Sequence, residues 1–325
     1  MFKIMKDYRL LENRWDGCKQ YFKKYVESND IDVEIISIKT ISQQLGLTRE
    51  QMIWYAFLYS VTHNVFSAFA ILYEFPDYST INYDKFDRFW KSEKQNLEFT
   101  SDRRRVKSMD YPLACIKSYK SIMGKDQEET LNEYIVEDAN QSYLNLMKFC
   151  SQFFYFGRYS IDLYLGKTTS LLGLNIDGEL IDFRSAESIR NGMLYALKMD
   201  DYVTLHHKKP IRQLTSEDYR FLDSKLLQLT GELNKEMGKK YTIWDVGSTL
   251  CPYKKLFWGD RYVGYYIDRQ LGELRRAEDK LKNIPFFPFW DIRKSKMNKE
   301  YLGELQGWDD IRKPLQKKFM ETGQL

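Results

Sequence analysis

The sequence is poor in residues that make tight turns. Its 325 residues include only 17 glycines and 7 prolines, well below the roughly 12% that these two types usually contribute. Aromatic residues are abundant, at 16%. This composition predicts a mainly α fold, a single large helical domain with few or no short strands and an irregular C-terminal extension.

Cysteine is also scarce, and its spacing forms no motif. The four cysteines stand far apart in the chain, with no CxxC pair among them: Cys18, Cys115, Cys150 and Cys251. This spacing predicts free thiols in a reducing cytoplasm and gives no indication of a disulfide framework or a zinc site.

Neither sign of charge is in large excess. Lys and Arg number 50, Asp and Glu number 46, and the net charge is +4. A surface for nucleic acid would therefore have to come from local clustering of cations rather than from bulk charge.

Membrane and export signals are missing as well. The N-terminus, "MFKIMKDYRLLENRWDG", lacks the uninterrupted apolar core of a signal peptide. The longest apolar run, residues 52–75, is interrupted by Ser, Thr, His63 and Asn64, so it predicts one buried helix rather than a membrane span. We expect no membrane partner and a cytoplasmic location.

The common catalytic motifs are absent. The chain has no HExxH, GxGxxG, Walker loop or GxSxG, so hydride transfer, P-loop phosphoryl transfer and common serine hydrolysis lack their usual signatures. No cofactor is identified, and the pattern leaves open a divalent metal as well as the oligomeric state.

Several helix boundaries can be read directly. Thr48 and Gln51 form a capping-box pattern, and Thr215 is placed to cap a long periodic segment. The partly alternating residues 31–38 leave a short strand open. We predict a helical domain over residues 1–282 and a proline-rich and aromatic extension over 283–325 packed on it.

Residues 182–201 predict an amphipathic helix with an Asn-Gly pair at its centre. At about 100° per residue, Ile189, Met193, Ala196 and Leu197 fall on a core face. A polar stripe lies opposite and consists of Arg184, Ser188, Asn191 and Tyr195. Gly192 lies beside the stripe, where it either marks a tight helix crossing or gives clearance to a ligand.

Two further segments combine cations with aromatic rings. Arg158 and Ser160 lie among the aromatics of residues 153–164, where the arginine must either reach solvent or find a carboxylate or phosphate partner. The second segment has the composition of a nucleic-acid groove and contains Tyr253, Lys254, Lys255, Trp258, Arg261, Tyr262, Tyr265, Tyr266 and Arg269. Its alternative is a core with a solvated basic face.

The order of five segments resembles the amino acid:DNA transferase and alpha-glutamyl/putrescinyl thymine pyrophosphorylase group of bacterial viruses. The segments are "WYAFLYSVTHNVFSAFAILYEFP", "DRRR", "GRYS", "SAESIRNGMLYALKMDD" and "STLCPYKKLFWGDRYVGYYIDR". The resemblance implies an enzyme that displaces pyrophosphate from 5-pyrophosphoryloxymethyluracil in double-stranded DNA with an amino acid or polyamine. It also implies action in the cytoplasm of an infected bacterium.

On this resemblance, the residues acquire expected roles. Arg158, Arg190, Lys254 and Arg261 would stabilise the leaving pyrophosphate. Tyr195, Tyr262 or Tyr265 would stack on a flipped base and Asn191 would read its edge. Arg184, Ser188, Asn64, Ser160, Tyr253, Lys255 and Arg269 complete the expected binding set, and Asp268 or Asp201 would be the general base.

Cys251 gives a sharper hypothesis. It lies close in sequence to Lys254 and Lys255, a setting that favours the thiolate, and attack on C6 of the uracil would help to expel pyrophosphate. The alternative is a small core residue. Two other functions also stay open, a base-flipping DNA glycosylase and a non-catalytic DNA-binding accessory protein.

Overall fold

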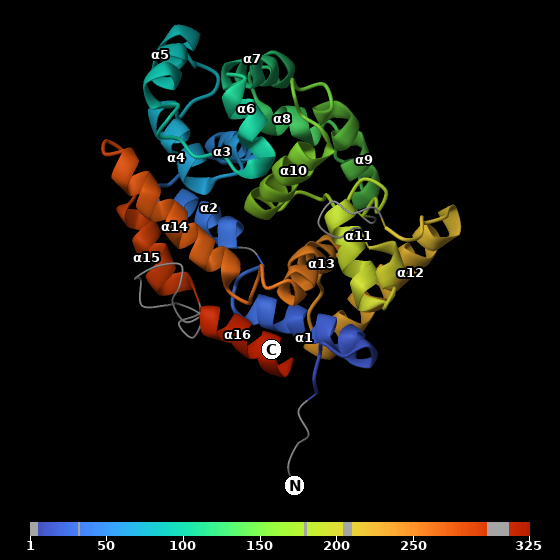
Figure 1. The fold of residues 1–325 in the computed structure, drawn as a ribbon. Helices are drawn as coiled ribbons and strands as arrows, with labels where there is room; N and C mark the ends of the chain where they lie inside the picture. The colour runs from blue at the N-terminus through green and yellow to red at the C-terminus, as the bar shows by residue number, and fades with distance from the viewer. Residues whose placement is uncertain (1–5, 32, 179–180, 204–209, 298–311) are drawn as a thin grey trace. The chain divides into compact units, whose positions relative to one another are not determined.

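The computed structural model describes residues 6–31, 33–178, 181–203, 210–297 and 312–325, with side chains in the last range from Gln316 onward. Within these ranges every regular element is a helix and no strand is present, which confirms the mainly α prediction (Figure 1). Among the residues described, no helix combines the length and the apolar character needed to cross a membrane. The chain forms two compact units.

Unit 1 is assembled from three separated stretches, residues 1–32, 178–269 and 297–325. Its helices are η1 (Leu11–Asn13), α1 (Arg14–Glu27), α11 (Glu187–Ala196), η3 (Asp200–Tyr202), α12 (Ser216–Met237), α13 (Ile243–Phe257), the start of α14 (Tyr265–Lys280) and α16 (Arg312–Thr322). The ends of the chain meet here, because the Tyr8 amide donates to the Gly323 carbonyl over 3.0 Å.

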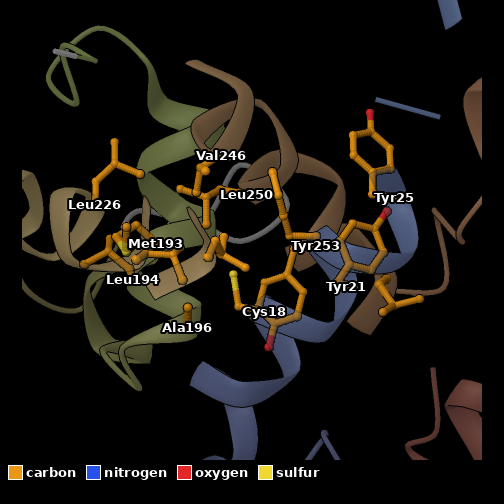
Figure 2. Packing of buried hydrophobic residues seen from close by; sticks show 14 of the residues in the cluster. Cys18, Tyr21, Tyr25, Met193, Leu194, Ala196, Leu226, Val246, Leu250 and Tyr253 are labelled. Carbon is orange, nitrogen blue, oxygen red and sulfur yellow. The ribbon is translucent and has the colours of Figure 1, made fainter. Parts of the chain in front are cut away.

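The core of unit 1 lies between α1, α11, α12 and α13. Met193 and Leu194 of α11 pack with Leu250 and Tyr253 of α13 and with Tyr21 of α1, all essentially without exposed surface. Figure 2 shows these side chains converging from the three helices. Burying a Leu or Met side chain contributes about 1.5–3 kcal/mol, so this cluster fixes how α11 and α13 lie against each other.

Unit 2 comprises residues 33–177 and 270–296. Its helices are α2 (Val33–Gln44), α3 (Arg49–Thr62), α4 (Val65–Glu74), α5 (Tyr83–Glu93), η2 (Ser101–Arg103), α6 (Arg104–Ser108), α7 (Pro112–Met123), α8 (Gln127–Asn132), α9 (Ala139–Cys150), α10 (Arg158–Leu172), the end of α14 and α15 (Phe287–Lys296). Of residues 31–38, for which a strand stayed open, residues 33–38 lie in α2.

The core of unit 2 is aromatic and surrounds α3. Phe57 stacks on Tyr119 of α7 with ring centres 3.8 Å apart and on Phe156 at 5.4 Å. The capping box predicted at Thr48 and Gln51 is confirmed at the start of α3. Such a box satisfies two backbone amides that would otherwise lack partners, and it sets where this buried helix begins.

The apolar run at residues 52–75 is two helices and not the single helix predicted. α3 ends at His63, which adopts the left-handed conformation with φ 51°, and α4 begins at Asn64. The Asn64 side chain accepts a hydrogen bond from the Ser67 amide over 2.9 Å. An N-cap of this kind starts a new helix, so the two polar residues mark a break in the run.

Candidate functional site

Gly192 is the point at which α11 and α13 touch. A Cβ added to Gly192 would lie 2.1 Å from the backbone oxygen of Leu250, a separation that real Cβ atoms do not reach. Gly192 could either mark a tight helix crossing or leave space for a ligand. The structure shows the helix crossing, because α13 fills the space beside Gly192. The glycine is required because the two backbones approach so closely.

The structure corrects the helical wheel drawn over residues 182–201. The helix is shorter, Glu187–Ala196, so Arg184 precedes it. Asn191, predicted on a polar stripe, is 2% exposed, and Leu194 is fully buried. α11 packs against both α13 and α12 and against α1, so it has several buried sides rather than one core face.

The crossing brings together three polar side chains on its two helices. Ser188 lies one turn before Gly192, and Cys251 directly follows Leu250. The Ser188 hydroxyl oxygen is therefore 2.8 Å from the Cys251 sulfur, and Lys254 Nζ donates to the same hydroxyl over 3.2 Å. We call Ser188, Cys251 and Lys254 the thiol cluster.

Lys254 is unusually buried for a lysine. It is 4% exposed, and its ammonium lies 5.2 Å from the centre of the Trp258 ring. Burial lowers the pKa of Lys254, and the nearby cations Lys255 and Arg190 add to this, whereas Cys251 and Glu187 act in the opposite direction. A desolvated lysine beside a thiol is a setting in which pKa values are tuned for chemistry.

Cys251 differs from the other three cysteines. It alone of the four is half-exposed, while Cys18, Cys115 and Cys150 are buried. Burial raises the pKa of Cys18 and of Cys115 to about 12 and raises that of Cys150 further. Thiols of that kind are inert, so Cys251 is the cysteine suited to act as a nucleophile.

The arginines near α11 are engaged in the fold. Arg190 donates to the carbonyl oxygens of Phe183 and Arg184 at 2.8 and 3.1 Å, and so ties down the turn before α11. Arg184 is exposed, and its guanidinium carbon lies 4.8 Å from the centre of the Tyr219 ring. The predicted role of Arg190 at the leaving pyrophosphate and that of Arg184 in binding substrate or DNA stay predictions.

Tyr195 and Arg14 form a pair that the sequence did not indicate. The Arg14 guanidinium carbon lies 4.2 Å from the Tyr195 ring centre, and Arg14 Nη1 is 2.6 Å from the Asp200 carboxylate. Burial raises the pKa of Tyr195. The face of Tyr195 that was predicted to stack on a base is thus covered by an arginine from α1.

Tyr253 is part of the core and is not available to a ligand in this structure. It has no exposed surface, and its hydroxyl donates to the Arg14 carbonyl over 2.7 Å. The predicted contact of Tyr253 with DNA stays a prediction. A helix places Tyr253 and Lys254 about 100° apart, so neighbours in sequence have different surroundings here.

The predicted carboxylates have contrasting surroundings. Asp268 is 1% exposed and accepts a hydrogen bond from the Tyr262 hydroxyl over 3.1 Å. Asp201 is exposed, and its carboxylate lies 3.7 Å from the Arg212 guanidinium. These surroundings do not single out either carboxylate, so the assignment of the general base to Asp268 or Asp201 stays a prediction.

Cations and rings alternate after α13 much as the sequence suggested. The Arg261 guanidinium carbon lies 3.8 Å above the Tyr265 ring and 6.0 Å from that of Tyr266. Lys255 and Arg269 are half-buried. α13 itself continues through Pro252 to Phe257.

The three predicted residues in unit 2 have structural contacts. Asn64 is the cap of α4, and Ser160 is 1% exposed near the start of α10. Arg158 Nε lies 3.9 Å from the Asp162 carboxylate one turn along the helix. The carboxylate alternative for Arg158 is therefore the one present.

Trp258 and Ser188 show what the sequence could and could not indicate. Trp258 follows Lys254 by four residues, a spacing that places both on one helix face, so the sequence alone could indicate the contact between these two side chains. Ser188 and Cys251 are 63 residues apart, and only the crossing at Gly192 makes them neighbours.

Within the described ranges, no group of three or more His, Cys, Asp or Glu side chains is arranged to hold a metal ion.

An accessible thiol in contact with a hydroxyl that also accepts from a buried ammonium defines a candidate nucleophile site of a group-transfer enzyme. The comparison with protein families agrees. A family model described as amino acid:DNA transferase matches residues 26–262, which is well over half of the chain, and the protein belongs to this family. It is a transferase that modifies DNA with an amino acid.

A curated relative supports the same assignment. A protein named Serinyltransferase, from Salmonella phage ViI, is 27% identical over 310 residues. The match covers 88% of this chain and 74% of the relative. The resemblance noted in the sequence, which included the segments around Cys251 and Gly192, is confirmed at the level of the family.

Proposed function

We propose that the protein joins an amino acid to a thymine derivative in DNA by displacing pyrophosphate from 5-pyrophosphoryloxymethyluracil, with Cys251 as the covalent catalyst. The observation that carries this proposal is the thiol cluster, in which Cys251 contacts Ser188 at 2.8 Å and Lys254 lies 3.2 Å from the same hydroxyl. Family membership supplies the reaction class, and the cluster supplies a nucleophile for it.

The covalent step begins with addition of the Cys251 thiolate to C6 of the base. The electron pair of the C5–C6 double bond moves onto the C4 carbonyl oxygen. When the enolate collapses, a double bond forms between C5 and its exocyclic carbon. The bond from that carbon to oxygen breaks, and pyrophosphate leaves with the electron pair. Covalent catalysis thus divides a difficult displacement into two easier steps.

Transfer is completed by the amino acid. Its amine adds to the exocyclic methylene carbon, the enolate re-forms, and expulsion of the Cys251 thiolate from C6 restores the C5–C6 double bond. The amine gives up one proton to a general base, for which Asp268 and Asp201 are the candidates. The balance is one pyrophosphate released for each carbon–nitrogen bond formed.

Lys254 and Ser188 act on the charge at this centre. The Lys254 ammonium, held beside Cys251 and away from water, stabilises the thiolate and the charge that grows on the leaving group. Fixed cations in a site with little water are effective in this role. Ser188 accepts a hydrogen bond from Lys254 and contacts the thiol of Cys251, so it positions the ammonium and the thiol relative to each other.

The base must leave the DNA stack to reach a thiol that is only half-exposed. Enzymes that act on atoms within a duplex extrude the nucleotide into the protein. We infer that the same holds here, and that Arg261 with Tyr265 contributes to gripping the strand, since stacked arginines and exposed rings contact phosphates and bases.

A product assay tests this function. The full chain is incubated with duplex DNA carrying 5-pyrophosphoryloxymethyluracil and a mixture of amino acids and polyamines, with and without Mg²⁺, and the DNA is digested to nucleosides for mass spectrometry. We expect an amino-acid adduct on the base and an equal amount of pyrophosphate. Serine is the first amino acid to test, because a relative is a serinyltransferase.

The same assay separates the alternatives. Release of a free base would indicate a glycosylase, and unchanged DNA would indicate a binding protein. A polyamine adduct without an amino-acid adduct would keep the transfer chemistry and change the co-substrate. Either of the first two results contradicts the proposed function.

A further inference from the structure

Arg103 of unit 2 is a buried cation whose donors are not all used. It lies at the junction of η2 and α6 and is 7% exposed. Its Nε and Nη2 atoms are buried, and among the residues that the structure describes no acceptor lies within hydrogen-bond distance of either. Leaving a buried guanidinium without an anion is costly, and burial lowers the pKa of Arg103.

The start of α10 lies against this arginine. The guanidinium carbon of Arg103 is 5.3 Å from the ring centre of Tyr159, the second residue of this 15-residue helix. The N-cap is Gly157, which makes no side-chain cap hydrogen bond. A side chain from the first turn of α10 therefore lies against a buried cation, and both a buried cation and the N-terminus of a helix favour an anion.

The Tyr159 hydroxyl contacts His63, which in turn contacts Thr100. The Tyr159 hydroxyl is 3.3 Å from Nδ1 of His63, and the Thr100 hydroxyl is 3.1 Å from the same nitrogen. His63 reaches this position through its left-handed backbone at the end of α3, a conformation that costs energy in a residue with a side chain. Strain of this kind often accompanies a functional site.

The charges around Arg103 leave it in need of a partner. Asp102 is a carboxylate that acts on the pKa of Arg103; its side chain is 56% exposed and lies 3.7 Å from His63 Nδ1. The other groups that act on Arg103 are neutral, namely Tyr159, Cys115 and Tyr155. The carboxylate of Asp102 is thus shared with His63 and is open to solvent.

We propose that Arg103 and the N-terminus of α10, with Tyr159 beside them, form a binding site for a small oxyanion. A planar guanidinium with Nε and Nη2 on one side matches the two oxygens of a carboxylate or a phosphate. The oxyanion is either the carboxylate of a free amino acid or a phosphate group. This site does not depend on the chemistry at Cys251.

Titration calorimetry on the full chain tests the site. The probes are inorganic pyrophosphate, inorganic phosphate, serine and serinamide, which is serine without its carboxylate. If the oxyanion is a phosphate group, we expect heat of binding from inorganic phosphate and pyrophosphate. If it is the carboxylate of an amino acid, we expect heat of binding from serine but not from serinamide. If none of these probes binds the wild-type chain, the proposal is overturned.

Two matched substitutions locate the site. Arg103→Met should weaken binding of the oxyanion about 10- to 100-fold, the value of one or two hydrogen bonds to a charged group. Arg104→Ala removes the same charge from the next, exposed position and should leave binding unchanged. Binding that survives in Arg103→Met, or that is lost equally in Arg104→Ala, contradicts the proposal.

A stability measurement separates ligand binding from a structural role. Replacing a buried unpaired charge with an apolar side chain of similar size is often neutral or stabilising, so Arg103→Met should melt at the same temperature as the wild type or higher when no anion is present. Marked destabilisation would indicate that Arg103 holds the fold. In that case Arg103→Lys, which keeps the charge without the planar fork, should still lose most of the binding.

Discussion

Lys254 in unit 1 and Arg103 in unit 2 are both buried cations, and they have different surroundings. Lys254 in unit 1 donates to the Ser188 hydroxyl at 3.2 Å, and that hydroxyl touches a thiol. Arg103 in unit 2 lies against the Tyr159 ring, and two of its nitrogens have no hydrogen-bond partner among the described residues. Burial lowers the pKa of both side chains.

The different surroundings of Lys254 and Arg103 indicate different roles for the two buried cations. A cation beside a nucleophile is suited to act on charge that develops during a reaction. A cation with unused donors and no nucleophile is suited to hold an anion that is already charged. We therefore assign chemistry to the thiol cluster and binding to Arg103, and the predictions below test that division.

The largest effect is expected at the nucleophile. Cys251→Ser keeps the size of the side chain but removes the thiolate, so transfer should fall by on the order of 10⁴-fold or more, as when a nucleophile or its partner is removed from other enzymes. The measurement is the rate of adduct formation on DNA. Full activity in this variant would remove covalent catalysis from the account, and an unchanged melting temperature is the control.

The next effect is expected at the ammonium. Lys254→Met should lower kcat about 10²- to 10³-fold, the usual result of deleting one group that stabilises developing charge. Lys255→Ala, which removes the adjacent half-buried cation, should have a much smaller effect. Equal losses in the two variants would indicate a general electrostatic contribution instead of a specific one.

The same lysine predicts a pH dependence. Because burial lowers the pKa of Lys254 below its usual value of 10.5, its positive charge disappears at a lower pH than that of an exposed lysine. Activity that needs the ammonium should therefore decline as pH rises, with a midpoint below 10.5. Lys254→Arg keeps the charge at high pH, so any activity it retains should show no such decline in a pH–rate profile.

The helix crossing predicts an effect on stability. Gly192→Ala forces a Cβ against the backbone of α13, and the overpacking should lower the free energy of unfolding by about 1–3 kcal/mol. It should also reduce activity by moving Ser188 away from Cys251. Urea denaturation checks the first expectation and the transfer assay checks the second.

Gly231 is the matched control for Gly192. It is an exposed glycine within α12, and an added Cβ would meet nothing within 4 Å. Gly231→Ala should therefore raise the free energy of unfolding by roughly 0.5–1 kcal/mol. If both glycine variants behave alike, the close approach of α11 and α13 is not the reason for Gly192.

The smallest effect is expected at the exposed carboxylate. The ion pair between Asp201 and Arg212 is exposed and spans 3.7 Å, so Asp201→Asn should change the free energy of unfolding by no more than about 0.5 kcal/mol. A loss of kcat in this stable variant would identify Asp201 as the general base, and an unchanged kcat would leave Asp268. Chemical denaturation and the transfer assay together decide between them.

Local features of the fold were predictable from the sequence. The all-helical class and the caps at Thr48 and Thr215 follow from composition and from short-range hydrogen bonding, and the structure confirms them. These features depend on neighbours within four residues. The break at His63 and Asn64 was missed because the apolar residues on both sides outweighed two polar residues that could equally be buried in one helix.

The candidate site was predictable only in part. Cys251, Lys254 and Ser188 were all chosen from the sequence, yet their contact depends on Leu250 meeting Gly192, a tertiary contact between distant segments. The helical wheel assumed one core face and therefore placed Asn191 in solvent. Arg14 and Arg103 could not be chosen, since only packing distinguishes a buried arginine from a solvated one.

Mass spectrometry of the protein after a single turnover tests the central claim most directly. The full chain is mixed with duplex DNA carrying 5-pyrophosphoryloxymethyluracil in the absence of any amine, then denatured, digested with nuclease and protease, and mapped. We predict a nucleoside attached through sulfur to the peptide that contains Cys251, with pyrophosphate released, and no such adduct in Cys251→Ser. Amino-acid transfer at the full rate in Cys251→Ser, with no adduct trapped on the wild-type chain, would contradict the account.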